Sequence, residues 1–114
     1  MAIKFYCDID DLGENWIEMS DRWTHAEAKA AEEAMSGGWA DYLAYLAKKV
    51  EGCSLKAGGA ILTNFADITE STLDMMDLRL VGFIGGILQQ TTMRLRALGN
   101  ASARVSSPKN DGKK

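Results

Sequence analysis

The sequence predicts an α+β fold, in which a small N-terminal antiparallel β-hairpin or sheet packs against three or four α-helices. Three observations predict it: apolar and polar residues alternate at the start of the chain, apolar residues recur with a helical period later, and helix caps lie between these segments. The chain has 114 residues, 46% of them hydrophobic, and one proline, which is typical of one globular domain. We expect this domain to span residues 1–99 and a disordered basic C-terminal tail to span 100–114.

The first nine residues have the pattern of a half-buried strand. Ile3, Phe5, Cys7 and Ile9 alternate with more polar residues. A turn over 10–14 and a returning strand over 16–19 then complete the expected N-terminal β-hairpin.

Two helices are expected next. Thr24 and Glu27 have the spacing of a capping box, and the helix that they start is expected to run to about Met35 and to stop at the glycine pair 37–38. A second helix is expected from Trp39 to Val50, ended by Gly52. Its apolar residues share one face: Trp39, Tyr42, Leu43, Leu46 and Val50.

The rest of the domain is expected to contribute one further helical region. Residues 53–63 fit either a second short hairpin or a long loop, and 69–72 cap a helix that is either short or continuous with the apolar segment after it. A helical stripe then runs down to Gly99, through Leu73, Met76, Leu80, Ile84, Ile87, Leu88, Leu95 and Leu98. The expected core includes Phe5, Ile17, Leu43, Leu46, Leu80, Ile84 and Leu88.

Charge is distributed unevenly along the chain. Residues 1–80 carry a net charge of −8 and residues 81–114 one of +5. Either this is a solvated acidic body with an ordinary basic end, or the basic end meets an acidic partner or the acidic body of a neighbouring copy. We expect no nucleic-acid partner, because the bases are few and not interleaved with aromatic residues. We expect no membrane partner, because the longest apolar run, 80–88, is far shorter than the roughly 20 residues of a span.

No motif for catalysis, metal binding or cofactor binding is found. His25 is the only histidine, and no second histidine or cysteine lies near it in sequence. The acidic segment 8–14 lacks the ligand spacing of an EF-hand, and the glycine-rich segment 82–86 lacks the ending of a phosphate-binding loop. Cys7 and Cys53 are expected to be reduced and buried. The sequence therefore predicts a protein that is not an enzyme and has no cofactor.

Three glycines interrupt the apolar helix, although each costs about 1 kcal/mol relative to alanine. Gly82 and Gly86 are four residues apart and share one face, which lets another backbone approach closely. Either this face packs against neighbouring elements of the same chain, or it binds a partner or a second copy. In the second case, the candidate partner-binding residues are Gly82, Phe83, Gly86, Gln90 and Arg94.

The order of these features resembles a known family. The features are the N-terminal hairpin, the segment 16–24 entering an acidic helix, Cys53-Ser54-Leu55 before a glycine pair, and the segment 68–74 leading into an apolar helix. Over about residues 3–98, the chain resembles the tail assembly chaperones of long-tailed bacteriophages, which are encoded between the tail-tube and tape-measure genes.

The resemblance implies a non-enzymatic α+β protein that coats the tape-measure protein during virion morphogenesis and leaves before the virion is complete. Its partners would be the tape-measure protein, the tail-tube protein and further copies of itself, in the cytoplasm of the bacterial host. Many such proteins are extended by a programmed ribosomal frameshift, and the ending 111–114 is compatible with a slippery stretch. The alternative is a structural minor tail or connector protein retained in the virion. A small enzyme is the least supported class.

The composition of residues 100–114 generates a first prediction. This segment contains one valine and no other large apolar residue, so it has little to bury. Truncation after Asn100 should leave the melting temperature nearly unchanged in a thermal unfolding experiment. A truncated protein that failed to fold would show that the segment docks on the domain.

Overall fold

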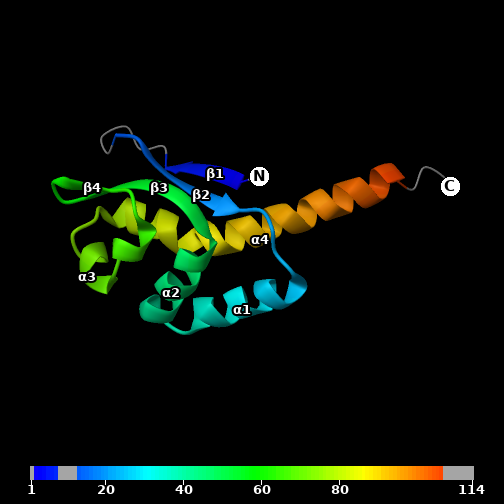
Figure 1. The fold of residues 1–114 in the computed structure, drawn as a ribbon, viewed down its shortest axis with the longest axis horizontal. Helices are drawn as coiled ribbons and strands as arrows, with labels where there is room; N and C mark the ends of the chain where they lie inside the picture. The colour runs from blue at the N-terminus through cyan, green and yellow to red at the C-terminus, as the bar shows by residue number, and fades with distance from the viewer. Residues whose placement is uncertain (1, 8–12, 107–114) are drawn as a thin grey trace.

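The computed structural model describes residues 2–7 and 13–106, and over these residues the α+β fold is confirmed (Figure 1). A four-stranded antiparallel sheet lies on one side of the molecule in this view, and helices α1 (His25–Ser36) and α2 (Trp39–Lys49) lie on the other side. The long helix α4 (Leu78–Ser106) runs between them, and its C-terminal part extends beyond the other elements.

The strands of the sheet follow one another in sequence order: β1 (Ala2–Cys7), β2 (Asn15–Ser20), β3 (Val50–Ala57) and β4 (Ala60–Leu62). Phe5 of β1 pairs with Ile17 of β2, which in turn pairs with Cys53 of β3. The two strands of the predicted N-terminal hairpin are therefore confirmed, while Ile9 of its first strand and residues 10–12 of its turn lie outside the described residues.

Residues 53–63, for which the pattern left two interpretations, belong to a hairpin. β3 and β4 are antiparallel and are joined at Gly58 and Gly59. Gly58 has a φ of +59°, a conformation that glycine adopts without the steric cost of a Cβ. Its amide donates to the carbonyl of Met75 at 3.0 Å. This hydrogen bond ties the tip of the hairpin to the segment that precedes α4.

The capping box at the start of α1 is confirmed. The amide of Glu27 donates to Thr24 Oγ1 at 3.2 Å, and the amide of Thr24 donates to Glu27 Oε1 at 2.7 Å. The other carboxylate oxygen of Glu27 accepts a hydrogen bond from Lys49 Nζ at 2.6 Å. This hydrogen bond lowers the pKa of Glu27. One side chain thus both caps α1 and connects it to the last residue of α2.

The helix predicted from Trp39 to Val50 ends one residue earlier than expected. The helix ends at Lys49, and Val50 already belongs to β3, where it pairs with Met19. Val50 is β-branched and has extended dihedral angles (φ −79°, ψ 126°), which suit a strand better than a helix end. Helix and strand therefore follow each other directly, and Gly52 lies within the strand.

The helical region after the sheet is divided into short and long parts. A 3₁₀ turn, η2 (Phe65–Asp67), precedes α3 (Glu70–Leu73), which is a separate short helix capped by Thr69. The following helix, α4, does not end at Gly99 as the sequence predicted, because it continues through 100–106. Gly99 is not among the described glycines with a positive φ, so it does not form the left-handed cap that usually ends a helix. Residues 107–114 lie outside the described residues.

The core lies where α4 meets the sheet and α2. Six of the seven residues expected there are buried: Ile17, Leu43, Leu46, Leu80, Ile84 and Leu88. The seventh, Phe5, is only half-buried, because β1 is an edge strand with a neighbour on one side. Leu98 was expected in the same apolar stripe but is 56% exposed, because α4 has by then passed the end of the sheet (Figure 1). Cys7 and Cys53 are buried and form no disulfide.

A buried tyrosine joins α2 to α4. The hydroxyl of Tyr42 donates to the carbonyl oxygen of Ile84 and accepts from the amide of Leu88 at 3.4 Å. Burial raises the pKa of Tyr42 to about 12. The polar end of this side chain is therefore satisfied by the backbone of α4, inside an apolar interface.

Replacing this tyrosine generates a second prediction. Tyr42→Phe should lower the free energy of unfolding by about 1 kcal/mol, which is typical of one lost hydrogen bond. Because the pKa of Tyr42 is raised on folding, its contribution is present below the ordinary tyrosine pKa of about 10 and is lost as the pH rises toward 12. Urea denaturation of both proteins at about pH 8 and about pH 11 should show the difference between them shrinking. A difference in the free energy of unfolding that is constant with pH would contradict the raised pKa of the Tyr42 hydroxyl.

Candidate functional site

The side of α4 that faces away from the core is the main candidate for a functional surface. Leu78, Gly82, Gly86, Gln89 and Met93 follow one another at helical spacing and lie within one third of the helix circumference. We call this set the outward face of α4. Leu78 is 83% exposed and Met93 59%, which is high for large apolar side chains. Apolar residues therefore lie at both ends of this face, with two glycines between them.

The glycines of α4 have different surroundings. A Cβ added at Gly82 would meet nothing within 4 Å, and one added at Gly86 would meet only the end of the Gln90 side chain, at 3.6 Å. At Gly85, by contrast, an added Cβ would lie 3.3 Å from Trp39 Cη2. The interpretation that Gly82 and Gly86 pack against neighbouring elements is therefore wrong, and the close intramolecular contact occurs at Gly85.

Of the five predicted partner-binding residues, Gly82 and Gly86 lie on the outward face, Gln90 lies beside it and Arg94 lies farther around the helix. Gly82, Gln90 and Arg94 are exposed, and Gly86 is half-exposed. Phe83 differs, because its partly buried side chain packs against the hydrophobic core.

Sequence reasoning did not name Leu78, Gln89 and Met93 as site residues. The signal was nevertheless present, because these residues continue the spacing set by Gly82 and Gly86 in both directions. Extending the glycine pattern by one or two helical turns would have found them.

An ion pair between Asp77 and Arg79 fixes the beginning of α4. The carboxylate of Asp77 accepts from the Arg79 amide at 2.9 Å and from the Arg79 guanidinium at 2.9 and 3.0 Å. These hydrogen bonds lower the pKa of Asp77 to about 2, so this carboxylate stays ionised at neutral pH. Further along the helix, Arg94 and Arg96 are exposed. Asp77 and Arg79 form an ion pair at the start of α4, and the charged residues further along the helix are arginines.

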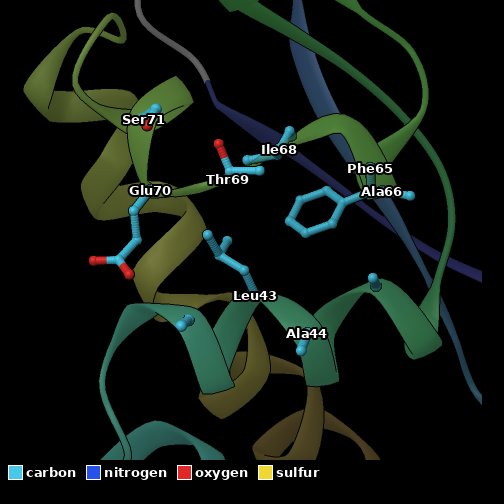
Figure 2. Close-up of a pocket in the computed structure, with 10 residues that line it drawn as sticks. Leu43, Ala44, Phe65, Ala66, Ile68, Thr69, Glu70 and Ser71 are labelled. Atoms are coloured by element: carbon cyan, nitrogen blue, oxygen red, sulfur yellow. The ribbon is translucent and has the colours of Figure 1, made fainter.

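A hollow lies between α2 and the η2–α3 segment (Figure 2), with a volume of about 470 Å³. Its walls are mostly apolar, and Leu43 points from α2 toward the loop that carries Ile68 and Thr69. Glu70 is its one charged lining residue. No histidine or cysteine is among its described lining residues.

His25 lines another hollow, of about 340 Å³, together with Asp21, Trp23 and Arg96. The described residues of this lining include no serine or cysteine that His25 could activate. Among the described residues, no group of three or more His, Cys, Asp or Glu side chains is arranged to hold a metal ion. None of the helices in the described part of the chain combines the length and the apolar character that crossing a membrane requires.

Comparison with models of protein families, with curated proteins and with solved structures finds no match to this chain.

The contrast between the glycines generates a third prediction. Gly82→Ala should raise the free energy of unfolding by about 0.5–1 kcal/mol, because it adds helix propensity and its Cβ meets no neighbour. Gly85→Ala should raise the free energy of unfolding by less, because its Cβ would press on the Trp39 ring. Urea denaturation of the two variants measures the difference. Equal gains would show that Trp39 does not restrict Gly85.

Proposed function

We propose that this protein is a non-enzymatic bacteriophage tail assembly chaperone, which binds helical segments of the tape-measure protein during tail morphogenesis. The observation that carries the proposal is the outward face of α4, where Leu78 and Met93 are exposed on either side of Gly82 and Gly86. The resemblance of the chain to this family supplies the identity of the partner.

The outward face of α4 suits a helical partner. Exposed apolar side chains provide binding energy when an amphipathic helix covers them. The two glycines leave room along the middle of the face, so that the backbone of a partner helix can approach α4 closely. The face therefore has apolar contacts at its ends and space for close packing at its centre.

The expected mechanism is shielding. A long helical protein with apolar stripes aggregates before the tail tube is built around it, and a small protein that covers those stripes prevents this. Such a function requires no catalytic group. On this proposal the protein acts in the cytoplasm of the bacterial host and is absent from the finished particle.

Filling the middle of the outward face generates a fourth prediction. Gly86→Leu should weaken binding of the tape-measure protein at least roughly tenfold, which corresponds to about 1.4 kcal/mol, because it blocks close approach of the partner backbone. The free energy of unfolding should change by less than the roughly 1–3 kcal/mol of an overpacked core site. Co-purification with the co-expressed tape-measure protein and a urea denaturation curve measure the two effects.

Gly99→Leu is the matched control. Gly99 also lies on α4, is exposed, and has no atom within 4 Å of an added Cβ, but it lies six residues beyond Met93, the last residue of the outward face. This variant should bind the tape-measure protein normally. A severe loss of stability in Gly86→Leu with unchanged binding would show that the outward face is not the binding surface. Finding the protein in purified virions would favour a structural tail component instead.

A further inference from the structure

We infer that the C-terminal end of α4 in one copy of this chain docks in an acidic, apolar groove beside α3 of another copy. The docking end consists of residues 94–106, which we call the α4 tip. This inference does not rest on the proposed function, because it concerns contacts between copies of this chain only.

The receiving groove consists of two hollows on either side of the first turn of α3. One is the hollow of about 470 Å³ between α2 and the η2–α3 segment (Figure 2), and the other, of about 430 Å³, lies between α2, α3 and the start of α4. Glu70 and Ser71 line both hollows, which we together call the α3 groove. Its walls are mostly apolar and accessible, because Ala40 and Ala44 are exposed on α2 and Leu78 is exposed on α4.

The charged residues that line the α3 groove are acids. Glu70 and Asp74 are both exposed, and no base is among the described lining residues. Along the chain, the base nearest to these two acids is Arg79, whose guanidinium donates to both carboxylate oxygens of Asp77. That ion pair adds no net charge, so the groove keeps the negative charge of its lining.

Two lysines follow the part of α2 that lines the groove, and both have contacts elsewhere. The ammonium of Lys49 donates to the carboxylate of Glu27 at 2.6 Å. The ammonium of Lys48 lies 6.0 Å from the centre of the Tyr45 ring, and Tyr45 is not among the described lining residues. These lysines therefore do not cancel the acids of the α3 groove.

The α4 tip continues the apolar stripe of the helix beyond the part that the domain covers. Leu98 follows Leu80 by 18 residues, which is five helical turns, so both residues lie on the same side of α4. Leu80 is fully buried, whereas Leu98 is 56% exposed. The tip thus offers a large apolar side chain that its own domain leaves in contact with solvent.

The charge of the tip is opposite to that of the groove. Residues 80–106 contain three arginines and no acid, namely Arg94, Arg96 and Arg104. Arg96 forms an ion pair with Glu32 of its own chain at 3.7 Å. The exposed Arg94, about one turn before Leu98, is therefore the arginine that we expect to meet the acids of the groove.

The tip cannot reach the groove of its own chain. Leu98 lies 20 residues after Leu78, or about 30 Å along the axis of one continuous helix. The groove and the tip lie at opposite ends of the molecule, and the tip extends beyond the other elements (Figure 1). A second copy supplies what the groove lacks, namely an accessible helix end with an apolar side chain and the opposite charge. The resulting contact is head-to-tail, because it joins two different surfaces of the chain.

Two variants that each lose one side of the contact test the docking. Leu98→Asp changes the tip and keeps the groove, whereas Glu70→Arg changes the groove and keeps the tip. Light scattering over a concentration series should show that the wild-type protein self-associates. Each variant alone should do so with a dissociation constant raised roughly tenfold or more.

Mixing the two variants gives the decisive measurement. An equimolar mixture should form a 1:1 complex, because the unchanged tip of the Glu70→Arg variant docks in the unchanged groove of the Leu98→Asp variant. A wild-type protein that is monomeric at all concentrations would overturn the inference. So would a mixture that associates no more strongly than either variant alone.

Matched changes at other exposed sites are the controls. Glu33→Arg on α1 makes the same charge reversal as Glu70→Arg, and Met93→Asp on the outward face of α4 matches Leu98→Asp. Neither control should change the association, and a loss equal to that of Leu98→Asp would contradict the docking. Asp74→Arg is a second groove variant and should replace Glu70→Arg in the mixture. Urea denaturation should give wild-type unfolding curves for all of these variants, because the replaced side chains are exposed.

Salt tests the electrostatic part of the contact. Added salt screens the attraction between exposed charges, so the self-association of the wild-type protein should weaken as the salt concentration rises. Association that is equally strong at about 0.1 M and about 1 M salt would show that charge does not select the α4 tip for the groove.

Discussion

The fold depends on the packing of one helix, α4, against two neighbouring elements. On one side, α4 packs against the sheet, and on another it packs against α2 through the Tyr42 hydroxyl and the Gly85–Trp39 contact. Leu80, Ile84 and their neighbours are fully buried as a result. Because both neighbours lie on the apolar part of the helix, the remaining third of its circumference is left to the solvent. The outward face of α4 is therefore a consequence of how the core is built.

Local features of the fold could be predicted from the sequence. The alternation through Phe5 and the capping box at Thr24 and Glu27 depend on residues that are close in the chain, and both predicted elements are present. The short helix α3 was one of two expected outcomes, and its cap at Thr69 is also local. These features are determined by dihedral preferences and hydrogen bonds within a few residues.

Features that depend on distant partners could not be predicted in the same way. Val50 continues a helical pattern in sequence, but its pairing with Met19 makes it a strand residue. Gly82 and Gly85 look equivalent in the chain, and only the position of Trp39 separates a packed glycine from an open one. Leu98 belongs to the apolar stripe but is exposed, because the stripe does not show where the sheet ends.

The extension of α4 beyond the other elements has a hydrodynamic consequence. The molecule measures 57 × 31 × 22 Å, and its Cα radius of gyration of 16.7 Å exceeds the roughly 13 Å of a compact chain of this length. An elongated particle diffuses more slowly than a sphere of equal mass, so a single chain of 12.4 kDa should elute early in gel filtration. The elution volume alone would therefore overestimate the molar mass, so that a monomer could be taken for a dimer. The molar mass has to be measured by a method that does not depend on shape.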